Sequence, residues 1–314
     1  MLFRTRAVQA AFGAAAAALL VLAAPVAAQE VDLRAQVAAY VQPTNEARTR
    51  VVVDQLRAAG FDPVVETFTG RNPRGGEMEG RNVVVTLGDG PREILLTAHY
   101  DAVVLRDGSL SHGVVDNAAS VVGVIEAAKI LKGKALNHRV RIILFDQEEL
   151  GLVGARKWIE THGLDNVAAV VNSDVAGYGD TLMYGQNNGA QSAFVTRAVQ
   201  ELCAERAMQC VGFPIYPPSD DRAFSGVGRP QGAPAGAVVP TVSLGFQDEV
   251  GAHQMWLAFN GGETPGLAEG FVPRVFQLIH SDGDTMEQID PATVKTAGEV
   301  YAALIERLDA QLAE

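Results

Sequence analysis

Apolar runs alternate with helical patterns along most of the chain, and this alternation predicts the fold. The run Glu-Ile-Leu-Leu-Thr-Ala-His at 93–99 is typical of a buried strand, because a central parallel strand is apolar on both faces. Further strands are expected at 63–69, 82–87, 139–145, 167–172, 181–186, 211–216 and 239–246. Helices are expected at 31–60 with a turn near 43–45, and at 118–132, 151–161, 190–208 and 291–313. Strands that alternate with helices predict a single-domain α/β fold whose mixed, mostly parallel sheet is sandwiched between α-helices.

The first 28 residues have the pattern of a secretory signal peptide. Arg4 and Arg6 precede an Ala/Leu/Val-rich stretch, and Val26-Ala27-Ala28 places small residues where a signal peptidase cuts. Cleavage after Ala28 would leave residues 29–314 as one domain without a stable membrane anchor. An uncleaved anchor is the alternative, because the apolar run is nearly long enough to span a bilayer. A signal peptide is favoured, so we expect a periplasmic or secreted protein.

Composition and charge narrow the classes of partner. The 314 residues are 48% hydrophobic and 20% charged, which suits a globular protein rather than a disordered one. The formal net charge of −12 argues against nucleic acid or an anionic membrane as a partner. The two cysteines, Cys203 and Cys210, are expected to form a local disulfide in an oxidising compartment. Two buried free thiols are the alternative.

Potential metal ligands follow the predicted strands. Open α/β sheets bind ligands at the carboxyl ends of their strands, and carboxylates placed there are costly unless they are paired or bind a metal. Mixed nitrogen and oxygen ligands suit zinc. Alternation along the strand at 93–99 also lets Asp101 accept a hydrogen bond from the His99 ring, as a metal-binding histidine requires. The candidates at strand ends or in the loops that follow are His99, Asp101, Asp116, Glu148, Glu149, Asp174 and His280.

The order of these motifs resembles peptidase family M28, the co-catalytic zinc exopeptidases that include secreted bacterial leucine-type aminopeptidases. The chain contains His-x-Asp at 99–101, Asp-Asn-Ala at 116–118 and Glu-Glu-x-Gly at 148–151. Asn-x-Asp then follows at 172–174, and His280 precedes an Asp-Thr pair at 284–285. The resemblance covers roughly residues 82–290 and implies the zinc-exopeptidase fold.

The resemblance also implies a role for each motif residue. His99 and Asp174 would bind one of two zinc ions per chain, Glu149 and His280 the other, and Asp116 would bridge them. Glu148 would be the general base and acid, and Asp101 would orient His99. The Asp116–Asn117 peptide would be cis.

Substrate-binding residues are less well marked in the sequence. The segment Pro-Ser-Asp-Asp-Arg-Ala-Phe at 218–224 resembles a segment that lines the site in the family, so Asp220 or Asp221 is a candidate for binding the substrate's α-amine. Some members carry a tyrosine before the last histidine ligand, where this chain has Ile279. Candidates to replace that tyrosine as the group that stabilises the oxyanion are Tyr216, Tyr178 and Arg222.

Other residues have no place in these motifs. The Gly/Pro/Ala-rich stretch 228–270 is expected to be a long loop beside the site that shapes specificity. His112 is expected in a loop and His138 at the surface. Asp146 is expected to be solvated.

These patterns predict an exported zinc-dependent exopeptidase that acts on peptides, with an aminopeptidase favoured. A glutaminyl cyclase, which would use a single zinc on the same fold, is one alternative, and a carboxypeptidase or dipeptidase is another. A non-catalytic binding module is disfavoured, because such a protein should have lost ligands.

Overall fold

The computed structural model describes residues 32–72, 75–226, 238–263 and 266–313. The chain divides into Met1–Val31 and Asp32–Glu314, and all described residues belong to the second unit. The predicted signal peptide and its cleavage site lie outside the described residues. Within the described ranges, no helix combines the length and the apolar character needed to cross a membrane.

An eight-stranded mixed sheet forms the centre of the fold, in the order β1-β2-β4-β3-β5-β8-β6-β7. The pairs β3/β4, β3/β5, β5/β8 and β6/β7 are parallel, and the pairs β1/β2, β2/β4 and β6/β8 are antiparallel. This confirms the predicted mixed, mostly parallel sheet. The strands are β1 (Val64–Arg71), β2 (Glu77–Leu87), β3 (Glu93–His99), β4 (Arg139–Phe145), β5 (Val167–Ser173), β6 (Thr181–Gly185), β7 (Cys210–Phe213) and β8 (Thr241–Gln247).

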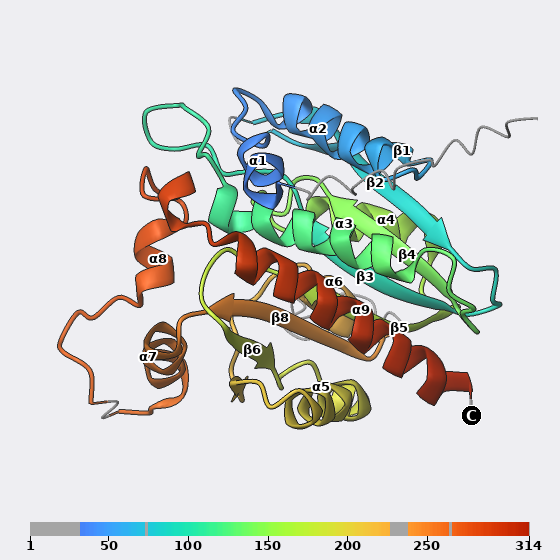
Figure 1. Ribbon diagram of the computed structural model, residues 1–314. Helices are drawn as coiled ribbons and strands as arrows, with labels where there is room; N and C mark the ends of the chain where they lie inside the picture. Colours follow the sequence, from blue (N-terminus) through green and yellow to red (C-terminus); the bar gives the residue numbers. More distant parts are fainter. Residues whose placement is uncertain (1–31, 73–74, 227–237, 264–265, 314) are drawn as a thin grey trace, which may run out of the picture. The chain divides into compact units, whose positions relative to one another are not determined.

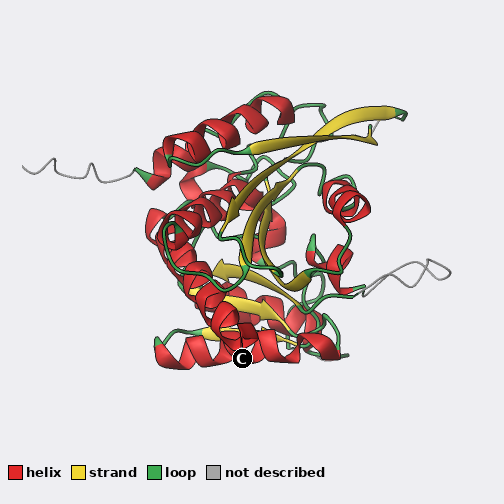
Figure 2. Cartoon of the chain, turned by 90° about the vertical axis from the view of Figure 1, so that its right-hand side faces the viewer, coloured by secondary structure: helices red, strands yellow, loops and turns green. Residues whose placement is uncertain are grey.

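Helices cover both faces of the sheet (Figures 1 and 2). One apolar core includes residues of α1, α2, α3, α5, α7 and α9, and a smaller core includes residues of α4 and α6. The α-helices are α1 (Leu33–Ala38), α2 (Asn45–Ala58), α3 (Ala119–Leu131), α4 (Val153–His162), α5 (Ala193–Glu205), α6 (Asp221–Ser225), α7 (Glu249–Asn260), α8 (Arg274–Leu278) and α9 (Pro291–Ala313). A π-helical turn η1 (Val114–Ala118) and two 3-10 turns, η2 (Ala190–Ser192) and η3 (Met286–Gln288), complete the set.

Strand β3 is buried along its whole length because both of its faces are covered. Ile94 and Leu96 join the larger core, whereas Leu95 packs on the opposite face with Trp158 and Phe224. The larger core is closed by α3 and α9, which run side by side over the sheet (Figure 1). The apolar run that predicted this strand is therefore explained by burial on two sides.

The structure tests the predictions for the two cysteines and for the stretch 228–270. Cys203 and Cys210 form the predicted disulfide between the end of α5 and the start of β7, with an S–S distance of 2.10 Å. Within the stretch 228–270, β8 confirms the strand expected at 239–246, but the expected loop is wrong over residues 249–260, which form helix α7. Residues 228–237 and 264–265 of that stretch lie outside the described residues. The glycine- and proline-rich composition concealed a helix that begins with a capping bond, from Gly251 N to the Asp248 carboxylate (2.9 Å).

Candidate metal centre and active site

The carboxyl ends of three adjacent parallel strands bring the candidate ligands together. β3 lies between β4 and β5, and His99 pairs in register with Phe145 at the end of β4. Glu148 and Glu149 follow β4, and Asp174 directly follows β5. Because the chain crosses to opposite sides of β3 at this point, the end of β3 is the crevice where such sheets bind ligands.

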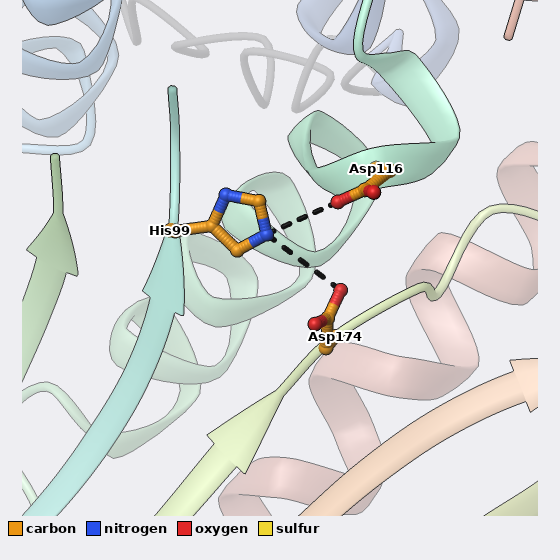
Figure 3. A group of neighbouring side chains, drawn as sticks. All are labelled: His99, Asp116 and Asp174. Carbon is orange, nitrogen blue, oxygen red and sulfur yellow. Dashed lines mark ion pairs between the residues drawn. The ribbon is translucent and has the colours of Figure 1, made fainter. Parts of the chain in front are cut away.

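The first cluster joins His99, Asp116 and Asp174 (Figure 3). His99 Nε2 lies 3.1 Å from Asp116 Oδ1 and 3.7 Å from Asp174 Oδ1. On the other side of the ring, His99 Nδ1 lies 3.4 Å from Asp101 Oδ1. Nδ1 thus faces Asp101 and Nε2 faces two carboxylates, but Nδ1 is buried without a hydrogen-bond partner, so the hydrogen bond predicted from the His99 ring to Asp101 is not formed.

The second cluster joins Asp116, Glu149 and His280. His280 Nε2 lies 3.2 Å from Asp116 Oδ2 and 3.0 Å from Glu149 Oε2. Asp116 thus turns one oxygen towards each histidine and belongs to both clusters. In each cluster, one ligand atom from every member lies within 4.8 Å of the others. The peptide between Asp116 and Asn117 is cis.

The chemistry of these clusters fits zinc. Asp174 Oδ1 and Glu149 Oε1 are buried without a hydrogen-bond partner. Carboxylate oxygens in that position need a cation or a proton, since an unpaired buried charge is costly. Two imidazole nitrogens together with carboxylate oxygens form the mixed donor set that zinc accepts.

Burial or interactions with neighbouring groups shift the pKa values of His99, Glu149 and His280 upward. The hydrogen bonds to Asp116 and Glu149 raise the pKa of His280 to about 11. Burial disfavours a charged His99, but its attraction to the neighbouring carboxylates of Asp101, Asp116 and Asp174 outweighs burial and raises the pKa of this residue too. Burial raises the pKa of Glu149 to about 7 and that of Glu148 well above its ordinary value. Raised pKa values favour protons on these groups, and a bound metal cation would take the place of those protons.

Hydrogen bonds join the segments that carry the candidate ligands to one another. Asp101 accepts from the backbone N–H of Glu148 (3.1 Å) and of Glu149 (3.2 Å), so it joins the end of β3 to the segment after β4. The Asn117 amide donates to Ser173 O (2.9 Å) and accepts from Val175 N (3.0 Å), which places its bonds on both sides of Asp174.

Asp284 connects the His280 segment to η1. Its carboxylate accepts from the backbone N–H groups of Val114 (2.9 Å), Val115 (2.7 Å) and Asp116 (3.2 Å). Asp284, which the sequence presented only as part of an Asp-Thr motif, therefore holds the backbone of Asp116, the residue shared by both clusters.

Arg48 on α2 was not recognised as part of the site from the sequence. The side chain is fully buried and donates to Tyr100 O through Nε, to Tyr40 O (3.0 Å) and His112 O (2.8 Å) through Nη1, and to Gly113 O (2.9 Å) through Nη2. It therefore holds the end of β3 and the start of η1. No local pattern announces this role, because an isolated arginine in a helix usually faces solvent.

An apolar cavity of about 250 Å³ lies beside the clusters. Asp116, Glu148, Glu149, Asp174 and His280 border it, and its remaining wall is mostly apolar. No Lys or Arg is among the described residues that line it. The apolar and neutral lining residues include Val175, Met183, Tyr216, Gln247, Met255, Val275, Phe276 and Ile279.

The candidates for oxyanion and amine binding differ in whether they line the cavity. Tyr216 lines the cavity, whereas Tyr178 is buried and donates to Gln247 Oε1 (3.3 Å), and Arg222 donates to the Tyr216 carbonyl oxygen (3.1 Å). Asp220 and Asp221 are fully buried and do not line the cavity.

The Asp221 carboxylate accepts hydrogen bonds from Asn188 Nδ2 (2.9 Å) and Ser219 N (2.9 Å). The expectations for Asp146 and His138 were wrong, because both side chains are buried. Asp146 accepts from Arg81 N (3.0 Å), and the His138 ring lies against Asp309.

Comparison with solved structures places the fold among the zinc exopeptidases. A Zn-dependent exopeptidase from Parabacteroides distasonis superposes with a TM-score of 0.66 at 19% identity, over 87% of this chain and 96% of that one. A zinc aminopeptidase from Bacillus subtilis gives a TM-score of 0.65 at 13% identity, over 87% and 93%. Porphyromonas gingivalis glutaminyl cyclase gives 0.64 at 18% identity, over 89% and 96%. At these identities the likeness shows the fold alone.

Sequence comparison identifies the family. The profile of peptidase family M28 matches residues 82–305, and the chain therefore belongs to this family of zinc-dependent peptidases. Aminopeptidase YwaD of Bacillus subtilis is 34% identical over 70 residues, which are 22% of this chain and 14% of that protein's length. The matched residues contain every predicted metal ligand.

Proposed function

We propose that the protein is a zinc-dependent aminopeptidase that binds two zinc ions per chain. The observation that carries the proposal is the pair of three-residue clusters sharing Asp116 beside a mostly apolar cavity. His99 and Asp174 would hold one ion, and Glu149 and His280 the other. Zinc bound there would lower the pKa of a water molecule and polarise the substrate carbonyl.

Glu148 is the residue proposed to move the proton. It lines the cavity next to Glu149 but belongs to neither cluster, so its carboxylate stays available. As general base it accepts a proton from the attacking water, and as general acid it then delivers that proton to the leaving amine. Burial and the neighbouring acids raise its pKa, which moves Glu148 towards the range where both transfers are efficient at neutral pH.

The lining of the cavity favours an aminopeptidase over a carboxypeptidase. Neither lysine nor arginine is among the described residues that line it, so the wall offers no side-chain cation to pair with a substrate's α-carboxylate. The apolar wall is suited to an uncharged side chain of the N-terminal residue, such as Leu, Met or Phe. The binding of the amine by Asp220 or Asp221 is not part of the proposal, because neither side chain lines the cavity.

Glutaminyl cyclase activity is the second candidate, since cyclases share the fold. A cyclase on this fold is expected to use a single zinc ion. Both clusters are complete in this chain, which favours the peptidase.

Aminoacyl-p-nitroanilides, tested beside their N-acetylated forms and an N-terminal glutaminyl peptide, distinguish these activities. We expect the zinc-loaded protein to hydrolyse only the free-amine substrates. In Glu148→Gln, kcat should fall by about 10²- to 10⁴-fold while the zinc content is unchanged. Glu160→Gln is the matched control, because Glu160 is exposed on α4 and pairs with Lys157. Cyclisation without hydrolysis, or equal hydrolysis of the acetylated substrates, would refute the proposal.

A further inference from the structure

A second cavity, of about 670 Å³, lies at the N-terminal end of α2. Three segments form its walls: residues 43–46, the β1–β2 hairpin and the loop 102–110. The loop between β3 and η1 is thus a wall of a cavity as well as a connection. The lining residues from these segments are Pro43, Thr44, Asn45, Glu46, Asn72, Met78, Glu79, Arg81, Ala102, Val103, Val104, Gly108 and Leu110.

Hydrogen bonds hold the loop 102–110 in a defined conformation. Leu105 N donates to Ser109 O (2.8 Å), and Ser111 N donates to Val103 O (2.9 Å). At the base of the loop, the Asn45 amide donates to Ala102 O (3.1 Å) and accepts from Ala102 N (2.9 Å). The loop is therefore fastened to the helix that forms the opposite side of the cavity.

The hairpin wall is fastened in the same way. Arg81 N donates to the buried Asp146 carboxylate (3.0 Å), and the Tyr100 hydroxyl donates to Arg81 O. The guanidinium of Arg81 pairs with Glu79. The cavity is thus largely preformed, which is usual for a ligand site.

Glu149 lines both this cavity and the apolar cavity beside the metal ligands. The proposed reacting centre therefore lies between two hollows of different character, one mostly apolar and the other polar in much of its lining. An exopeptidase has to accommodate two parts of its substrate, the residue that is removed and the chain that leaves. The apolar cavity beside the metal ligands has a wall suited to one uncharged side chain, that of the residue that is removed.

We propose that the second cavity binds the part of a peptide substrate that lies on the C-terminal side of the cleaved bond. The inference rests on the proposed aminopeptidase function and names its substrate class, which is peptides extending beyond a dipeptide. Two of the three walls, which contribute residues 43–46 and Asn72, Met78, Glu79 and Arg81, precede the segment matched by the family profile, whereas the loop 102–110 lies within it.

Filling the cavity tests the proposal. Val104 lines the cavity with 43% of its surface exposed, and a tryptophan there would occupy the space without touching the metal ligands. Arg106→Trp is the matched control, since Arg106 is exposed on the same loop and does not line the cavity. Each zinc-loaded protein is assayed on leucinamide, which has no chain beyond the cleaved bond, and on a leucyl tetrapeptide.

For the wild type we expect kcat/KM to be about tenfold or more higher for the tetrapeptide than for leucinamide, as subsite contacts of this size commonly provide. Val104→Trp should remove most of that advantage and leave leucinamide hydrolysis within about twofold, whereas Arg106→Trp should change neither. Met78→Trp, on the hairpin wall, is the second variant should Val104→Trp not fold.

Two results separate the inference from the function on which it rests. If Val104→Trp and Met78→Trp leave the tetrapeptide advantage intact, or lower both substrates equally, the second cavity is not a subsite. If the wild type hydrolyses neither substrate with zinc bound, the proposed aminopeptidase function fails instead.

Discussion

The guanidinium of Arg48 donates to the carbonyl oxygen of Tyr100, the residue between His99 and Asp101. The same side chain reaches His112 O and Gly113 O at the entrance to η1. One helix outside the matched family segment thus holds two of the segments that carry proposed metal ligands. We therefore expect the site to depend on this buried cation as well as on the candidate ligands.

Arg48→Lys is expected to destabilise the protein and to weaken zinc binding. An ammonium group cannot reach the carbonyl oxygens that the guanidinium fork bonds, and buried acceptors left unpaired cost about 1–3 kcal/mol each. Urea unfolding should show a loss of about 2–5 kcal/mol, and chelator titration a lower zinc affinity. Arg50→Lys, an exposed position on the same helix, should change neither. Wild-type zinc affinity in Arg48→Lys would show that the site does not need this clamp.

Tyr216→Phe is expected to lower kcat with little change in KM. Burial and the charge of Asp174 raise the pKa of Tyr216, so its hydroxyl keeps its proton and can donate to an oxyanion at neutral pH. Loss of one such donor typically lowers kcat by about 10²- to 10³-fold. Steady-state kinetics on the preferred p-nitroanilide measure the effect, and Tyr178→Phe serves as control because that hydroxyl bonds Gln247. An unchanged kcat in Tyr216→Phe would remove this tyrosine from the mechanism.

His280→Ala is expected to lower the zinc content by one ion per chain. Its imidazole is the only nitrogen donor of the second cluster, whereas the first cluster keeps His99. Mass-spectrometric metal analysis after dialysis should give two zinc ions for the wild type and one for the variant. His112→Ala should keep both, since His112 is exposed and belongs to neither cluster. A wild type that binds a single zinc would contradict the two-ion proposal and favour the cyclase alternative.

Asp309→Asn is expected to destabilise the protein at neutral pH but not at low pH. The Asp309 carboxylate accepts from Asn137 N (3.0 Å) and His138 N (2.8 Å). Burial alone would raise its pKa, but these hydrogen bonds outweigh burial and hold the pKa below the ordinary 3.8. A lowered folded-state pKa contributes stability above the unfolded pKa, and this contribution is lost as the pH falls through the folded value.

The difference in unfolding free energy between wild type and Asp309→Asn should therefore be about 1–3 kcal/mol at pH 7 and shrink below pH 4. Urea unfolding between pH 3 and pH 7 measures it. Glu306→Gln, on the same helix, removes only a surface pair with Lys134 and should have little effect at any pH. If the difference in unfolding free energy does not change with pH, the charge on Asp309 is not what stabilises the segment at Asn137 and His138.

The sequence by itself determined the sheet and the set of candidate ligands. Strand β3 was predictable because burial on both faces leaves a continuous apolar run, and the residues that follow such runs must meet at one edge of a parallel sheet. The order of the motifs then allowed His99, Asp116, Glu149, Asp174 and His280 to be assembled before their distances were known. These signals are local, so each can be read within a few neighbouring residues.

Only the tertiary structure decided which other groups support the site. Arg48, Asn117 and Asp284 act through bonds to segments far away in sequence, so no local pattern records their partners. Position relative to the cavity separated Tyr216, which lines it, from Tyr178, which does not, and burial removed Asp146 from solvent. A side chain's exposure depends on the segments that pack over it, and that information belongs to the folded chain as a whole.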